Sequence, residues 1–147
     1  MNDFIPKQIY EDSIIDIEIM YNSYKTYYDI LTRWLDNNMN DKKISDYLKK
    51  KNLNNIVIYG MGKLGELLYK ELINSNINVP YTLDSNIDNI KINQFKSKSI
   101  EDVDNSIDID VIIITPIYAA EPIKKDIKKV YKKSKIILTL DEIIFDI

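Results

Sequence analysis

The first third of the chain carries a long helical pattern of apolar residues. Between Ser13 and Asp36 there is no Pro or Gly, and apolar side chains recur at alternating steps of three and four. This spacing predicts an amphipathic helix with a broad apolar face. Ser13, followed three residues later by Asp16, is a start signal for such a helix. The apolar face consists of Ile17, Met20, Tyr24, Tyr27, Leu31 and Trp34, widened by Tyr21, Tyr28 and Leu35.

After this helix the pattern breaks and then changes character. A short helix is predicted over residues 42–51, with Asp41 as its N-cap. From residue 54 onwards, short apolar runs alternate with helical segments of about ten residues, which predicts right-handed βαβ units and a parallel sheet. The predicted strands are 56–59, 79–83, 91–93, 111–114 and 135–138, and the predicted helices are 63–74, 99–102, 121–133 and 141–147.

All three glycines of the chain lie in one hexapeptide, Gly60-Met61-Gly62-Lys63-Leu64-Gly65. It falls between a predicted strand and a predicted helix, the context in which G-x-G-x-x-G is typical of a dinucleotide-binding turn. Gly60 would permit the tight turn, Gly62 would let the backbone approach a pyrophosphate, and Gly65 would let the helix pack close to the strand. The helix N-terminus would offer N–H groups and a partial positive charge to the phosphates.

The glycine pattern, together with the alternation of strands and helices, indicates the fold class. We expect an α/β, Rossmann-like three-layer parallel sheet in the order 3-2-1-4-5, preceded by an N-terminal helical extension. The expected division is an N-terminal helical arm over residues 1–53 and a Rossmann-like nucleotide-binding domain over residues 54–147.

Two further positions are candidates for the same site. Asp84 follows the second predicted strand, about 20 residues after the glycine pattern, where an acidic residue binds ribose hydroxyls in dinucleotide folds. Its charge would repel a 2′-phosphate and so favour NAD over NADP. Thr115, Pro116 and Tyr118 follow the buried strand over 111–114 and would line the crevice beyond the carboxyl ends of the strands. The alternative is that the glycine turn serves packing alone and that Pro116 merely stiffens a connection.

The amino-acid composition excludes several kinds of catalytic and binding site. The chain has no His and no Cys, so it lacks the commonest general base, thiol nucleophiles and thiolate metal sites. A net charge of −3 and a pI near 5.0 argue against nucleic-acid binding. There is no signal-peptide core and no apolar run of the ~20 residues that span a bilayer. We therefore expect a cytoplasmic protein without membrane or metal partners and without independent catalytic activity, since the fold leaves no residues for a substrate domain.

The run from Ile56 to Gly65, followed by Leu83-Asp84-Ser85-Asn86, resembles a group of small Rossmann-like domains. These occur alone or fused within bacterial polysaccharide and sugar-modification proteins, and the resemblance covers about residues 42–147. It implies binding of NAD or a nucleotide-sugar as an accessory to surface-polysaccharide metabolism, and no reaction by itself. The alternatives are a non-catalytic interaction module on a Rossmann scaffold and a small NAD-sensing regulator.

The tyrosine-rich face of the first helix indicates that the chain binds another protein surface. Most of it is expected to pack on the chain's own core, yet it is wider than one contact surface requires. Tyrosine is enriched where an apolar ring is buried and its hydroxyl stays wet, as at interfaces. We therefore expect a homodimer formed through the helix between Ser13 and Asp36.

Overall fold

The computed structural model describes residues 7–87, 95–133 and 135–147. Its centre is a five-stranded sheet in the order β3-β2-β1-β4-β5, in which every pairing is parallel. This confirms the predicted α/β class and the strand order 3-2-1-4-5. The strands are β1 (Ile56–Tyr59), β2 (Thr82–Leu83), β3 (Ser97–Lys98), β4 (Val111–Ile114) and β5 (Ile136–Thr139).

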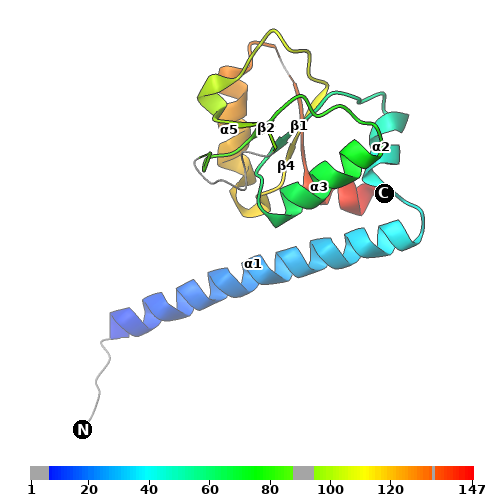
Figure 1. Ribbon diagram of the computed structural model, residues 1–147. Helices are drawn as coiled ribbons and strands as arrows, with labels where there is room; N and C mark the ends of the chain where they lie inside the picture. The colour runs from blue at the N-terminus through cyan, green and yellow to red at the C-terminus, as the bar shows by residue number, and fades with distance from the viewer. Residues whose placement is uncertain (1–6, 88–94, 134) are drawn as a thin grey trace.

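Helices cover both faces of the sheet, so the fold has three layers (Figure 1). Residues of α1, α2, α3 and α6 share one buried cluster with one face of the sheet, and α5 and η1 pack on the other face. The α-helices are α1 (Lys7–Met39), α2 (Ile44–Lys50), α3 (Lys63–Asn74), α5 (Ala120–Val130) and α6 (Leu140–Asp146), and the 3₁₀ turns are η1 (Ile100–Asp102) and η2 (Ile117–Ala119).

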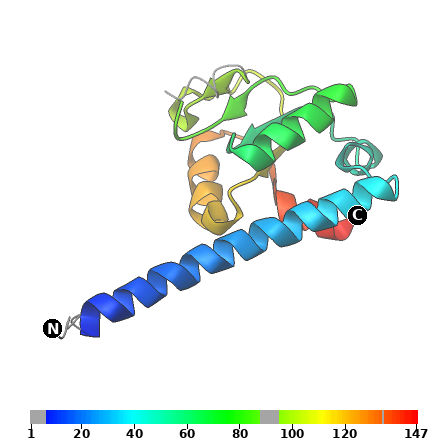
Figure 2. The same cartoon turned by 60° about the horizontal axis from the view of Figure 1, so that its bottom comes forward.

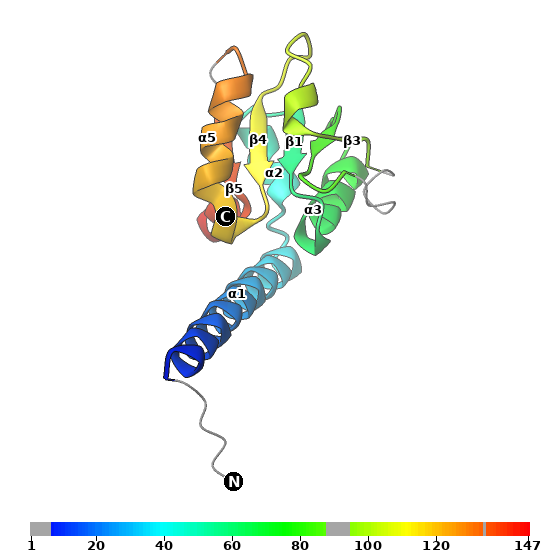
Figure 3. The same cartoon turned by 90° about the vertical axis from the view of Figure 1, so that its left-hand side faces the viewer.

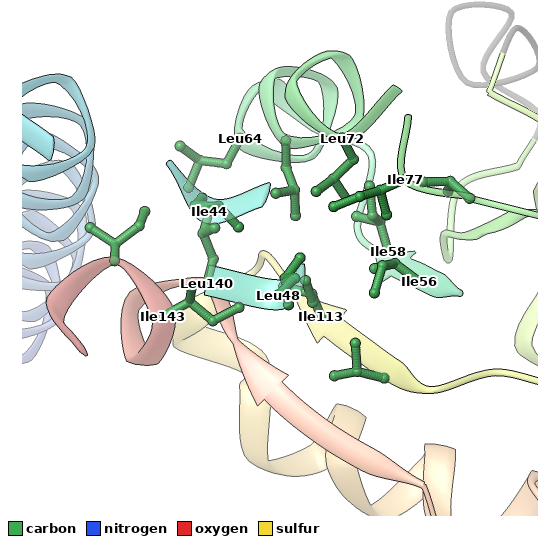
Figure 4. Close-up of a cluster of buried hydrophobic side chains, with 14 of the residues drawn as sticks. Ile44, Leu48, Ile56, Ile58, Leu64, Leu72, Ile77, Ile113, Leu140 and Ile143 are labelled. Atoms are coloured by element: carbon green, nitrogen blue, oxygen red, sulfur yellow. The ribbon is translucent and has the colours of Figure 1, made fainter. Parts of the chain in front are cut away.

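The core explains why the central strands read as unbroken apolar runs. All four residues of β4 are buried, because each face of the strand lies under helices. Ile113 points into the cluster that also holds Ile44 and Leu48 of α2 (Figure 4). The neighbouring Ile112 and Ile114 belong to the cluster under α5. Successive residues of β4 therefore point to opposite faces of the sheet and pack into two separate hydrophobic clusters.

Helix α1 is longer than predicted and is only partly packed. It begins at Lys7 and not at Ser13, since nothing in this stretch interrupts a helix. Residues 11–22 are all exposed, whereas Ile30 and Trp34 are buried in the core. The C-terminal part of α1 thus lies against the globular part, and its N-terminal part projects beyond it (Figure 2). No helix of the described residues combines the length and apolar character needed to cross a membrane.

The predicted N-cap at Asp41 is wrong. Asp41 has a φ of +58° and the N-cap of α2 is Lys43. The N–H of Lys42 donates to the carbonyl of Asn37 (2.8 Å), which closes the end of α1 around a left-handed residue. Asp41 therefore terminates the first helix and does not start the second.

The strands at the β3 edge also differ from the sequence pattern. The strand predicted over 91–93 lies outside the described residues. The third strand of the sheet is β3, where Ser97 pairs with Thr82. The strand predicted over 79–83 contracts to β2, because Pro80 has no N–H to donate to a ladder. The ends of α5, β5 and α6 differ from the predicted bounds by a few residues.

Candidate functional site

A pocket of about 420 Å³ opens beyond the carboxyl ends of β1, β2 and β4. This is the switch point of the sheet, where β1 is flanked by β2 on one side and β4 on the other, and ligands of open α/β folds bind there. Helix α1 runs past this edge of the sheet (Figure 3). The pocket is lined by Tyr24, Tyr27, Leu31, Gly60, Gly62, Lys63, Leu64, Asp84, Ser85, Thr115, Pro116 and Tyr118.

Most of the residues singled out in the sequence therefore meet in one place. The exceptions are Met61 and Gly65, which are buried behind the lining. Met61 belongs to the core cluster under α3. The glycine loop contributes its backbone and the side chains of Lys63 and Leu64, so the local pattern and the fold agree on this wall of the pocket.

Gly60 and Gly65 are required by the protein's own packing. Gly60 has a φ of +95°, and a Cβ there would lie 2.5 Å from Cδ of Pro116. A Cβ on Gly65 would overlap the carbonyl oxygen of Gly60. Both positions therefore bring α3 and the Pro116 loop close to the turn that leaves β1.

Gly62 has no such internal requirement. Its φ of −68° suits any residue, and a Cβ there would meet nothing within 4 Å. It is the N-cap of α3 and provides no capping side chain. The first N–H groups of a helix lack intrahelical acceptors, so this end of α3 presents backbone donors beside open space in the pocket.

Asp84 is held against the glycine loop. The N–H of Met61 donates to its Oδ2 (2.6 Å), and the N–H of Asn86 donates to its Oδ1 (2.8 Å). The carboxylate therefore ties the end of β2 to the turn after β1. Each oxygen retains a further acceptor site for a ligand hydroxyl. Burial, followed by the nearby charge of Asp84, raises the pKa of Tyr59 at the end of β1.

Thr115 and Tyr118, in the segment after β4, have different roles. Thr115 is buried, and its hydroxyl donates to the carbonyl of Gly60 (2.7 Å), so it fixes the glycine turn. Tyr118 is 73% exposed, and its ring meets that of Tyr27 edge to face, with 6.5 Å between the centroids. Tyr118 is thus the member of this segment with surface free for a ligand.

Helix α1 forms a wall of the pocket that the sequence analysis missed. Tyr24, Tyr27 and Leu31 line it, whereas the sequence pattern predicts core or interface positions for them. Burial, and next the neighbouring Tyr118, raise the pKa of Tyr27. The residue spacing shows that these side chains share a helix face, but no local signal says what lies opposite that face.

Two side-chain hydrogen bonds hold α1 in this place. The indole N–H of Trp34 donates to Oε2 of Glu71 on α3 (2.8 Å). The amide of Asn37 donates to the carbonyl of Ile144 on α6 (2.8 Å). Glu71 also accepts from the N–H of Ser45 (3.2 Å), so one carboxylate joins three helices.

The pocket offers few charged groups. Among its lining residues, Lys63 is the cation and Asp84 the anion. The Lys63 side chain is 71% exposed and pairs loosely with Glu66 at 3.6 Å. Among the described residues, no cluster of three or more acidic side chains is arranged to hold a metal ion. Comparisons of the chain with protein-family models, curated proteins and solved structures found no match.

Proposed function

We propose that the pocket binds the diphosphate and ribose of a nucleotide, either NAD-like or a UDP-sugar-like nucleotide-sugar. The observation that carries the proposal is the glycine at position 62. Packing accounts for Gly60 and Gly65, whereas Gly62 borders open space at an uncapped helix N-terminus. A phosphate there would accept from backbone N–H groups and lie near the cation of Lys63.

The remaining walls suit the other parts of such a ligand. Asp84 has acceptor capacity left for a ribose 2′,3′-diol, and its charge would disfavour a 2′-phosphate. The rings of Tyr24, Tyr27 and Tyr118 offer aromatic surface on which a base or a sugar ring can stack. The residues thus supply three kinds of contact, for phosphate, ribose and ring.

The proposed role is binding without turnover. Lys63, Asp84 and three tyrosines are the titratable groups of the lining, and Asp84 is engaged by two backbone N–H groups. Together with the resemblance to Rossmann-like domains of sugar-modification proteins, this favours an accessory protein of surface-polysaccharide metabolism that holds a nucleotide or nucleotide-sugar.

Isothermal titration calorimetry tests the proposal. Purified chain is titrated with UDP, UDP-glucose, UDP-N-acetylglucosamine and NAD, with uridine as the control that lacks phosphate. We expect at least one diphosphate ligand to bind with a micromolar to submillimolar Kd, and uridine to bind far more weakly. Absence of heat for all four diphosphates at millimolar concentration would reject the proposal.

A second candidate function is supported by a different observation. Helix α1 exposes a continuous apolar face, which includes Tyr21, Tyr24 and Tyr28, each more than 60% exposed. Soluble monomers seldom leave such a surface in water. The chain would then act as an interaction module that dimerises through α1. Ligand-dependent assembly would identify the third alternative, a small NAD-sensing regulator.

A further inference from the structure

The exposed face of α1 is a heptad repeat. Its residues follow one another at alternating steps of three and four, and each is at least 39% exposed. The a positions are Ile14, Tyr21, Tyr28 and Leu35, and the d positions are Ile17, Tyr24 and Leu31. A repeat of 3.5 residues over three heptads is the pattern by which one α-helix packs along another.

The chain's own globular part uses a different face of α1. Ile30, Trp34 and Asn37 are buried against the core and against α6, and Tyr27 is half-buried beside them. These four residues lie on the g and c flank of the heptad. The described residues therefore leave between 39% and 69% of each a and d side chain exposed, both along the packed part of α1 and along the projecting arm, residues 11–22.

We propose that a second copy of this chain covers the a and d face of α1, with the two helices antiparallel. In an antiparallel pair, e positions face e positions. Glu18 and Lys25 are both e positions, so each Glu18 comes beside Lys25 of the second copy. In the register that brings Glu18 beside Lys25 of the second copy, Tyr21 packs against Tyr24 of the second copy. Ile17 then packs against Tyr28 of the second copy.

The placement of the globular parts favours the same direction. In a parallel pair both globular parts would lie at the same end of the two-helix rod, and neither would reach the other copy's projecting arm. In an antiparallel pair each lies beside the other copy's projecting arm, which the described residues leave uncovered (Figures 2 and 3).

The surface is large enough for a stable dimer. Its seven heptad side chains expose on the order of 900 Å², since a large aromatic side chain carries about 150–250 Å², and a standard interface takes about 800 Å² from each partner. A lipid surface fits less well. The described arm carries Asp16 and Glu18 and has no Lys or Arg between residues 11 and 22, whereas helices that bind anionic membranes are basic.

This arrangement also completes the candidate pocket, an extension that rests on the proposed function. Tyr24 and Leu31 are d positions and also line the pocket. In the antiparallel register, Met20 of the second copy comes beside Tyr27, and Ile14 of the second copy comes beside Leu31. The partner's arm then lies over the mouth of the pocket and adds apolar surface to a site that is open in a single chain.

Introduced cysteines test the direction of pairing, because the chain has none of its own. Ile17→Cys and Tyr28→Cys are prepared separately, and each is treated with a short bismaleimide alone and as an equimolar mixture. We expect covalent dimer mainly in the mixture, because like positions of an antiparallel pair lie about 16 Å apart in this register. Dimer in each variant alone would indicate a parallel pair and overturn the proposal, as would a light-scattering mass of 17.3 kDa, one chain, at micromolar concentration.

A second experiment tests the cover over the pocket without any ligand. Lys63→Cys is labelled with a maleimide in the parent background and in the Tyr21→Glu, Tyr28→Glu background. Neither tyrosine lines the pocket, and both are exposed, so the double variant should fold and dissociate. Because the Lys63 side chain is 71% exposed in one chain, labelling should be at least fivefold slower in the dimer. Equal labelling rates in the two backgrounds would refute the proposal that the partner's arm lies over the pocket.

Nucleotide titration then separates the two proposals. If UDP or NAD binds, the Tyr21→Glu, Tyr28→Glu variant should bind it at least fivefold more weakly than the parent, with the same circular dichroism spectrum. Equal affinity in the two proteins would refute the composite site. Absence of binding in both would reject the nucleotide function while the cross-linking and labelling results still decide the antiparallel pairing.

Discussion

At the scale of single residues, three glycines of one motif have separate reasons to be there. Gly60 is fixed by its positive φ and by Pro116, and Gly65 by the backbone of Gly60. Gly62 is free of both constraints and borders the pocket. A motif that looks uniform in the sequence therefore contains two positions required for folding and one available for binding.

This difference predicts opposite phenotypes for two substitutions. Gly62→Val should abolish nucleotide binding and cost no more than about 1 kcal/mol of stability, the scale of an altered N-cap. Gly65→Ala should destabilise the chain by about 2–3 kcal/mol or more, because the added methyl overlaps backbone that must move. Urea unfolding and calorimetry measure both. A Gly62→Val protein that binds as tightly as the parent would remove the main support for the phosphate site.

Asp84 combines a structural contact with a proposed ligand contact. Asp84→Asn removes the charge and leaves one acceptor oxygen for the N–H groups of Met61 and Asn86. We expect a loss of about 1–2 kcal/mol of stability, because hydrogen bonds to a charged acceptor are the stronger kind. If an adenine dinucleotide binds, the parent should prefer NAD to NADP, and the variant should narrow that preference. Equal parental affinities for NAD and NADP would show that Asp84 does not face the ribose.

At the scale of elements, α1 connects the core, the pocket and the proposed interface. Its packed face includes Trp34, whose N–H donates to Glu71, the carboxylate shared by α1, α2 and α3. Tyr24 of its exposed face and Tyr27 of its g and c flank both line the pocket. A change that loosens α1 should therefore act on stability and on ligand binding together.

Trp34→Phe tests this coupling. The ring keeps most of its apolar contact, but Glu71 loses a donor, so we expect a loss of about 2 kcal/mol in the free energy of unfolding. Any nucleotide bound by the parent should bind several-fold more weakly, because the wall formed by α1 is less firmly held. Tyr28→Phe is the matched control: Tyr28 is 68% exposed in one chain, and the variant keeps the ring that the proposed pair of helices would bury, so its change should fall within about 0.5 kcal/mol. A Trp34→Phe protein with parental stability would show that the Glu71 contact contributes little.

At the scale of the whole molecule, the boundary between arm and globular part lies within α1. Residues 11–22 are exposed, whereas Ile30, Trp34, Ile44 and Leu48 belong to the same buried cluster as β1 and β4. The division into residues 1–53 and 54–147 remains a prediction, and two truncations test it.

Removal of residues 1–18 should leave the folded core of one chain within about 1 kcal/mol of its original stability, since residues 11–18 are exposed in the chain and exposed positions contribute little. Removal of residues 1–53 should prevent folding. Five buried apolar side chains of the described residues would be lost, namely Ile30, Trp34, Ile44, Leu48 and Leu53. Each is worth about 2–5 kcal/mol, against a total stability of about 5–15 kcal/mol. Circular dichroism and urea unfolding measure both truncations. A cooperative unfolding transition for residues 54–147 alone would show that the helical arm is dispensable for the core.

Elements whose signals are local can be recognised from the sequence alone. Unbroken apolar runs identified β1 and β4, and hydrophobic periodicity identified the long first helix. The glycine spacing located the turn between β1 and α3, because backbone freedom depends on residues near in the chain. The alternation of strands and helices then restricted the topology to a parallel sheet, since right-handed crossovers leave few alternatives. The order 3-2-1-4-5 was expected from the Rossmann-like glycine pattern, and the structure confirms it.

Which face of each element meets which neighbour depends instead on contacts between distant parts of the chain. The pattern of α1 contains two apolar stripes, and packing assigned Ile30 and Trp34 to the core and left Tyr21 and Tyr28 exposed. Tyr24 became a wall of the pocket through contacts with segments far along the chain. Asp84 was placed near the glycine loop by its spacing, but its hydrogen bond to the Met61 N–H depends on strand register. Such contacts join residues distant in sequence, and local periodicity carries no information about them.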